Sequence, residues 1–310
     1  MLRRLFAAGR PSTERDREGR SWARRIRAES EIPASFLDAL AAMNLAGTQP
    51  LPYMVLMPTF EGIFRRPETE KLVCLSGDCV YVLEDAASSV STVCHSPNDT
   101  FYIERGTVLL YSWLRIQGRS TDGTLSSTIL KFNTVTEDVI APITERLRSS
   151  SQANTAREYS TQPSGLHTLG RLNLKFRAYA ESSLRPGDSV IHWIYQPQIR
   201  SRRVALMGLN LTRQIAPSHL VMLTRRELIL ICDDDTQRPP IGDPYGAIRT
   251  YVPLSRIMSA SMHTAGSGLL ALQIQLAPGL DIEVKFELSR HEAVQELLST
   301  LAMKSDTLSP

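Results

Sequence analysis

The feature that most constrains the fold of this chain is a succession of strand-forming segments followed by one amphipathic helix, and it occurs twice. In each copy two short apolar runs come first: residues 72–75 and 80–83, then residues 220–223 and 228–232. Each copy later has a strand that ends in Lys-Phe and is followed directly by a helix-start signal. Strands that roll up against one final helix are typical of a small binding scaffold. A chain of 310 residues has room for two such domains, at roughly 150 residues each.

The second copy has the clearer strand pattern. Apolar and polar side chains alternate through residues 270–276 and 282–288, on either side of a Pro-Gly turn. Strict alternation places one face of this hairpin in a core and the other in solvent, as in an antiparallel sheet. Another hairpin is predicted at residues 220–232, with its turn at 224–227. Pro253 cannot donate a ladder hydrogen bond, so its strand should lie at a sheet edge or begin there.

Both copies are predicted to end in a helix. Ser289 and Glu292 form a capping-box pattern in the second copy, and Thr134 and Glu137 form one in the first. The final helix has an apolar stripe that must dock on a sheet: Val294, Leu297, Leu298 and Leu301. Pro142 interrupts the helical pattern of the first copy, which predicts a kink or a restart there.

The second copy resembles a known family of domains. Residues 223–231 and 251–257, with the following hairpin and helix, are similar to the bacterial PH-like (GRAM-related) pattern of an LTxxRLI segment and an IPLxxI segment. The resemblance covers about residues 185–303 and extends more weakly to 51–150. Glu227 stands where that family usually has a basic residue. The resemblance implies a seven-stranded, partly open antiparallel β-barrel capped by a helix, in a family whose members bind lipids, peptides or partner proteins.

We therefore expect a mainly β (α+β) protein with two PH-like, partly open antiparallel β-barrels, each capped by a C-terminal α-helix. The expected divisions are an Arg-rich N-terminal segment with a short helix (1–50), a first module (51–148), a linker (149–165) and a second module (166–310). Residues 1–30 have little apolar periodicity and are expected to be loosely ordered or partly helical. The short helix is predicted from the apolar spacing of Phe36, Leu37, Leu40 and Met43.

Composition excludes several classes of protein. A formal net charge of +3 does not indicate a nucleic-acid partner. No apolar run approaches the roughly 20 residues that span a bilayer, and the first residues lack a secretory apolar region. The expected location is therefore the cytoplasm. The four cysteines lie mainly in apolar contexts and are interpreted as buried, reduced thiols: Cys74, Cys79, Cys94 and Cys232.

No motif predicts a catalytic residue, a metal site or a cofactor. His291 and Glu292 begin like a zinc-protease motif, but Gln295 replaces the second histidine. The Gly-Ser-Gly segment at 266–268 precedes a strand, so that no helix N-terminus could hold a pyrophosphate. Residues 233–235 are three aspartates without the ligand spacing of a calcium loop, and a solvated acidic turn is the simpler interpretation. Trp113 and Trp193 are predicted to be aromatic residues of the hydrophobic core.

The basic clusters are the remaining candidates for a binding site. Five arginines are assigned to an anionic ligand: Arg200, Arg202, Arg203, Arg225 and Arg226. The planar guanidinium group suits bidentate contact with phosphate, and the open end of a PH-like barrel would place these residues near one rim. The alternative is a set of solvated loops.

The leading functional hypothesis is a non-enzymatic adaptor that mediates protein–protein interaction through tandem modules. The alternative is peripheral association with the inner membrane face through anionic lipid headgroups. A third hypothesis is a metal-dependent hydrolase that uses the loop at residues 233–246. Pairing of sheet edges into a homo-oligomer stays open, and no nucleic acid is expected as a partner.

Overall fold

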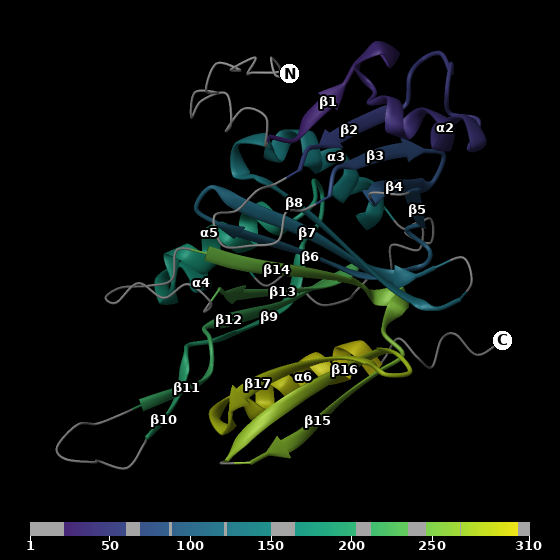
Figure 1. Cartoon of the computed structure of the whole chain (residues 1–310). Helices are drawn as coiled ribbons and strands as arrows, with labels where there is room; N and C mark the ends of the chain where they lie inside the picture. The colour runs from purple at the N-terminus through teal and green to yellow at the C-terminus, as the bar shows by residue number, and fades with distance from the viewer. Residues whose placement is uncertain are drawn as a thin grey trace, which may run out of the picture.

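The computed structural model describes residues 22–59, 69–86, 89–120, 123–149, 165–202, 212–234, 246–266 and 268–302. These residues form several antiparallel β-sheets, none of which is closed, and short helices (Figure 1). The expectation of a mainly β chain with a helix after its last strand is confirmed.

The first sheet contains five antiparallel strands in the order β1-β2-β3-β4-β5. They are β1 (Arg24–Ile26), β2 (Tyr53–Met57), β3 (Lys71–Ser76), β4 (Cys79–Ala86) and β5 (Ser89–His95). Helix α2 (Ala34–Ala42) packs on this sheet through buried Phe36 and Leu40, so the predicted short helix is confirmed. The expectation for residues 1–30 is wrong where the structure describes them, because β1 pairs with β2 and buries Ile26 opposite Met54. Residues 1–21 lie outside the described part.

The central sheet contains seven antiparallel strands in the order β8-β7-β6-β14-β13-β12-β9. They are β6 (Thr100–Val108), β7 (Tyr111–Arg119), β8 (Leu125–Asn133), β9 (Val190–Gln196), β12 (His219–Thr224), β13 (Glu227–Asp233) and β14 (Gly246–Pro253). Strand β6 pairs with β14 from Val108 opposite Gly246 to Ile103 opposite Tyr251. Strands from the two sequence copies therefore form one continuous sheet.

Two smaller sheets complete the strand structure. The three-stranded sheet has the order β15-β16-β17, with β15 (Ser259–Ala265), β16 (Leu269–Ala277) and β17 (Leu280–Glu287). Strand β10 (Ile199–Arg202) pairs with β11 (Thr212–Ala216) as a separate hairpin between β9 and β12. Figure 1 shows the three-stranded sheet below the central sheet, with this hairpin at its side.

The helices cover the two faces of the central sheet. One core joins that sheet to the first sheet and to α3 (Glu137–Arg148), α4 (His167–Leu172) and α5 (Leu174–Ser183). A second core lies between the other face, the three-stranded sheet and α6 (His291–Ala302). The stripe of α6 buries Val294, Leu297 and Leu301, and a fully buried leucine contributes about 1.5–3 kcal/mol. No helix of the described residues is both long enough and apolar enough to cross a membrane.

The order of elements recurs along the chain. Strands β2–β5, the meander β6–β8 and α3 are followed by β9 with β12–β14, the meander β15–β17 and α6. A 3-10 turn precedes the closing helix in both copies, η2 (Thr134–Thr136) before α3 and η5 (Leu288–Arg290) before α6. The predicted duplication is therefore present in the order of four strands, three strands and one helix.

Both predicted hairpins of the second copy are confirmed, as β12–β13 and β16–β17. The prediction for Pro253 is wrong, because β14 lies inside the central sheet between β13 and β6. Pro253 is the last residue of the strand, and the pairing with β6 ends at Tyr251. The missing N–H therefore lies beyond the ladder, where it removes no hydrogen bond to β6.

Neither capping box forms as predicted, because a 3-10 turn takes up the first residues of each pattern. Ser289 lies inside η5, and α6 begins at His291. In the first copy Thr134 instead donates its hydroxyl to the carbonyl of Leu109 at 3.0 Å. The prediction of a restart at Pro142 is also wrong, since α3 continues through this residue as one helix.

Two predictions about side-chain burial need correction. The four cysteines form no disulfide, but only Cys74 is buried, while the others are partly exposed. Trp193 packs against a core, whereas Trp113 lies on the sheet face opposite α3, across from Gly106. A Cβ atom at position 106 would stand 1.9 Å from Cζ2 of Trp113, so the indole lies over the bare glycine backbone.

Candidate functional site

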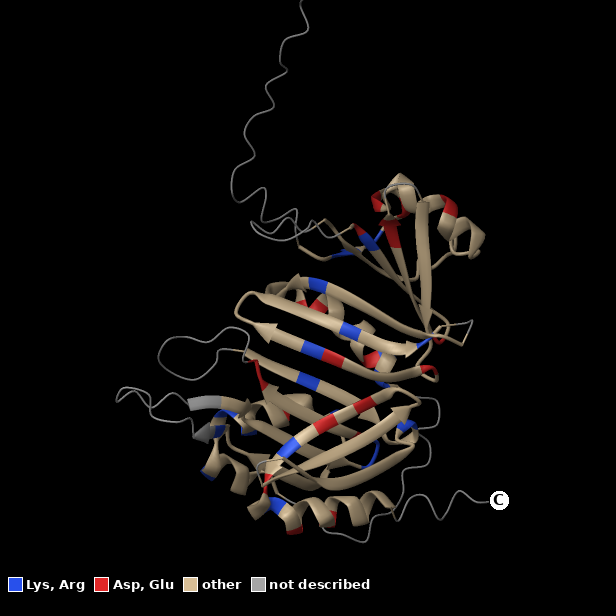
Figure 2. Cartoon of the chain, turned by 60° about the horizontal axis from the view of Figure 1, so that its bottom comes forward, with Lys and Arg blue, Asp and Glu red and all other residues tan. Residues whose placement is uncertain are grey.

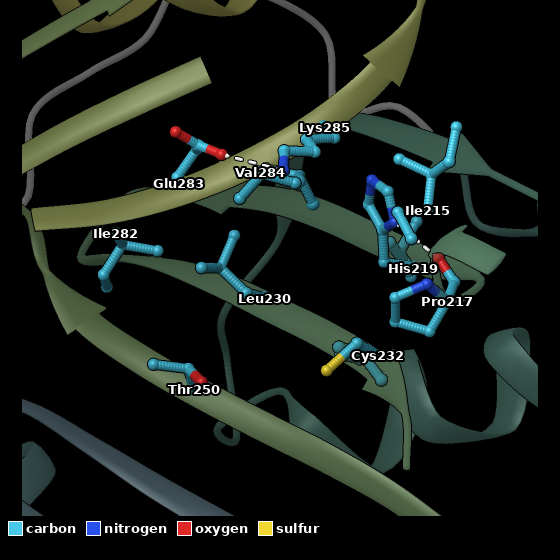
Figure 3. Close-up of a pocket in the computed structure, with 14 residues that line it drawn as sticks. Ile215, Pro217, His219, Leu230, Cys232, Thr250, Ile282, Glu283, Val284 and Lys285 are labelled. Atoms are coloured by element: carbon cyan, nitrogen blue, oxygen red, sulfur yellow. Dashed lines mark hydrogen bonds and ion pairs between the residues drawn. The ribbon is translucent and has the colours of Figure 1, made fainter. Parts of the chain in front are cut away.

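A groove runs between β17 and the face of the central sheet formed by β12–β14. Its volume is about 340 Å³, within the range of roughly 300–1,000 Å³ of ligand sites. The sheet contributes Leu230, Cys232 and Thr250, and β17 contributes Ile282 and Val284 (Figure 3). The lining is therefore mainly apolar.

The alternation of the strands explains this lining. Leu230 lies opposite Thr250 in the pairing of β13 with β14, so both side chains point to the same face of the sheet. Ile282 and Val284 are two residues apart on β17 and share its inner face. Leu230, Ile282 and Val284 pack against the second core but stay partly exposed.

One end of the groove is closed by contacts between β17 and the central sheet. The buried Gln196 side chain accepts a hydrogen bond from the backbone N–H of Glu287 at 3.1 Å. The rings of His219 and Phe286 pack edge to face, with their centroids 5.1 Å apart. These contacts hold the end of β17 against β9 and β12.

His219 adds an unsatisfied polar atom to the apolar lining. Its Nδ1 lies 2.9 Å from the carbonyl oxygen of Pro217, and because a carbonyl only accepts, Nδ1 carries the proton. Burial lowers the pKa of His219, and the bond to Pro217 opposes this effect. The ring is therefore neutral at pH 7, and its Nε2 is a buried acceptor with no hydrogen-bond partner in the described residues. A ligand in this groove would satisfy it with an N–H or O–H donor.

The outer side chains of β17 are mostly acidic. Asp281, Glu283 and Glu287 are exposed, and Lys285 pairs with Glu283 at 3.3 Å. Figure 2 shows these red and blue positions separated by tan ones along the strand in front of the central sheet. The groove is thus apolar inside and negatively charged along its outer border.

The structure does not bring together the five arginines that the sequence assigned to an anionic ligand. Arg200 lies exposed on β10, and Arg202 lies on the same strand with its side chain outside the described part, as is all of Arg203. Arg225 and Arg226 form the turn after β12, where Arg226 Nε lies 3.7 Å from Asp188. The pairing of β12 with β9 places these two groups at opposite ends of β12, which are roughly 17 Å apart at about 3.3 Å per residue.

Sequence reasoning missed a buried ion pair that links the two copies. Arg148, at the end of α3, donates from Nε to Glu227 at 3.3 Å and also bonds it through Nη2. The same Nη2 donates to the carbonyl of Ser183 at 2.9 Å, and the guanidinium lies 4.0 Å above the Tyr251 ring. Burial raises the pKa of Glu227, and Arg148 opposes this effect. The only signal in the sequence was Glu227 itself, an acidic residue at a position where the bacterial PH-like pattern usually has a basic one.

The aspartates at 233–235 do not form a solvated turn where they are described. Asp233 and Asp234 are buried, and Asp233 accepts from Lys175 Nζ at 2.6 Å. Asp235 lies outside the described residues. Within the described ranges, no group of histidine, cysteine and acidic side chains has the arrangement of a metal site.

No model of a known protein family matches the chain. No curated protein matches it significantly either.

Proposed function

We propose that this protein is a non-enzymatic adaptor that binds an extended segment of a partner protein along β17. The observation that carries the proposal is the outer edge of β17, which borders the apolar groove. Among the described strands β17 pairs with β16 alone. An exposed strand edge offers a row of backbone donors and acceptors, and an added peptide strand is a common form of recognition.

The direction of the backbone groups along β17 follows from one hydrogen bond. The N–H of Glu287 reaches the side chain of Gln196, so it points away from β16. N–H groups alternate in direction along an antiparallel strand. The N–H groups of Lys285 and Glu283 therefore also point to the outer edge, where a partner strand would accept from them.

The side chains of β17 define the chemistry of the partner. Every second residue of an added strand would face the groove lined by Leu230, Ile282 and Val284. The intervening residues would lie beside the acidic outer side chains of β17. The expected partner segment thus alternates apolar residues with lysine or arginine.

The recurring element order supports a second part of the proposal, that the halves are PH-like modules over residues 51–148 and 166–310. Four strands, a three-stranded meander and a closing helix occur in each half. A fold of this kind hosts many ligands, so the function is argued from the groove. Binding to anionic lipid has less support, because the predicted arginines lie at two separate ends of β12.

The proposal can be tested with one edge-blocking variant and its matched control. Glu283→Pro removes an outward N–H while leaving the ladder with β16 in place, since proline is tolerated on edge strands. Glu283→Ala removes the same side chain and keeps the N–H. The probe is a displayed library of random peptides, selected on the wild-type chain.

Selected peptides should alternate apolar and basic residues, bind Glu283→Ala and lose binding to Glu283→Pro. Circular dichroism must show that both variants are folded like the wild type. Equal binding to the proline variant would refute strand addition at β17. Flotation of the chain with acidic liposomes, lost in an Arg225→Ala/Arg226→Ala variant, would instead favour the membrane hypothesis.

A further inference from the structure

We propose that Arg105 and Arg249 form a binding site for a small phosphate-type oxyanion where β6 pairs with β14. The two arginines lie directly opposite each other in this pairing. They come from the two sequence copies, so the site exists only where the halves meet. Like charges that face each other on neighbouring strands are destabilising, and a bound anion would remove this repulsion.

The two arginines lie between helices. Helix α3 contacts β6, and α5 contacts β12 and β13, so the pairing of β6 with β14 lies between α3 and α5 (Figure 1). Arg249 lies 4.9 Å from the centroid of the Tyr179 ring and donates to the Ser182 hydroxyl at 3.5 Å. Both of these partners are residues of α5, and neither is an acidic side chain.

Both guanidinium groups have unused donors. The Nε atoms of Arg105 and Arg249 are buried without a hydrogen-bond partner in the described residues. Arg105 forms an ion pair with Glu137, whereas Arg249 forms none within the described part of the chain. A water molecule could accept from either Nε–H, but it would leave the charge of Arg249 without compensation.

The surrounding charges leave the positive charge of Arg249 as the one without an acidic partner in the described part of the chain. Burial lowers the pKa of Arg105, and the charges of Arg249 and Arg148 act in the same direction, while Tyr251 opposes them. The charge of Arg148 is already matched by Glu227. A tetrahedral oxyanion offers several acceptor oxygens, and two guanidinium groups can bind them bidentately.

The burial of the pair favours a small free ion. The Arg105 side chain is 15% exposed, which leaves little access for a lipid headgroup fixed in a membrane surface. Inorganic phosphate is therefore the ligand we expect. This site lies on the face of the central sheet that packs against α3 and α5, away from the groove beside β17, so it does not depend on the proposed adaptor function.

The test is the melting temperature of the full chain in increasing sodium phosphate, against sodium chloride at matched ionic strength. A ligand that binds only the folded state raises the melting temperature in a concentration-dependent way. The wild type should show this rise, and Arg249→Gln should abolish it. The control Arg225→Gln changes an exposed turn and should keep the rise. In phosphate-free buffer Arg249→Gln should melt no lower than the wild type, because it removes the repulsion between Arg249 and Arg105.

The same rise in Arg249→Gln as in the wild type would overturn the site. The absence of any phosphate-specific rise in the wild type would do so as well. Titration calorimetry of phosphate into wild type and Arg249→Gln gives an independent measure of binding and should show heat only with the wild type. Stabilisation by glycerol 3-phosphate without stabilisation by inorganic phosphate would refute the assignment to a free ion.

Discussion

Replacement of Arg148 by methionine should destabilise the chain more than any other single change at the junction between its two halves. Arg148→Met keeps an unbranched apolar side chain and removes the guanidinium that lies over the Tyr251 ring. Glu227 then remains almost fully buried, at 4% exposure, without its cation. The change therefore tests whether the buried ion pair is needed by the folded state.

The expected magnitude follows from the contacts that are lost. Arg148 makes two hydrogen bonds to the carboxylate of Glu227 and one to the carbonyl of Ser183. Hydrogen bonds to charged groups contribute about 1.5–3 kcal/mol, and removal of one partner from a buried pair costs about 3–5 kcal/mol in all. We expect the free energy of unfolding to fall by about 3–5 kcal/mol in Arg148→Met.

Urea unfolding followed by circular dichroism measures this loss, and its dependence on pH identifies the cause. Without Arg148, burial raises the pKa of Glu227 with only the charge of Arg185 left to oppose it, so the folded state holds a proton that the unfolded state releases. Stability then falls as pH rises above the unfolded pKa of about 4.3. The loss in Arg148→Met should be smaller at about pH 5 than at about pH 8.

A double variant separates loss of the pair from loss of packing. Arg148→Met/Glu227→Leu removes both charges, and such apolar replacements are often neutral or stabilising. It should recover most of the stability that Arg148→Met loses, without the dependence on pH. A loss below about 1 kcal/mol in the single variant, as for exposed ion pairs, would refute the reasoning.

Three further changes should have measurable effects. Gly106→Ala places a methyl group against Trp113 and should shift the tryptophan fluorescence, with a loss of about 1–3 kcal/mol in urea unfolding. Leu297→Ala should lower the free energy of unfolding by about 2–5 kcal/mol, whereas the exposed control Gln295→Ala should leave it nearly unchanged. Burial lowers the pKa of His95 to about 4, so the unfolded state binds a proton first and stability is lost as pH falls from about 6.5 to 4. This loss amounts to up to roughly 3 kcal/mol in the free energy of unfolding, and a His95→Gln variant should reduce the accompanying fall in melting temperature.

Local patterns predicted those parts of the fold that depend on neighbouring residues. The alternation through 270–276 and 282–288 specified β16 and β17, because the turn between them fixes their register. The stripe of α6 specified the buried side of the last helix. The capping residues predicted each helix start one or two residues too early, because a 3-10 turn precedes both helices.

Pairing between distant strands left no comparable signal. The register that places Arg105 opposite Arg249 joins residues 144 positions apart, and nothing in either strand specifies the other. Pro253 indicated an edge, yet the ladder with β6 ends before that residue. The groove was missed for a related reason. Alternation assigned Ile282 and Val284 to an inner face, but the extent to which the sheet covers them depends on how the two sheets diverge.

Contacts of the strand edges distinguish β17 from β5, β8, β9 and β15, which are other edge strands of the described sheets. The continuous central sheet protects β6 and β14 by pairing them with each other, so neither can recruit another strand. Strands β9 and β15 lie against α6, β5 lies against β7, and β8 lies against β2. Strand β17 instead borders the groove, which the contact with Gln196 closes at one end. Because an exposed strand edge favours pairing with another chain, the acidic side chains of β17 would select which chains can pair there.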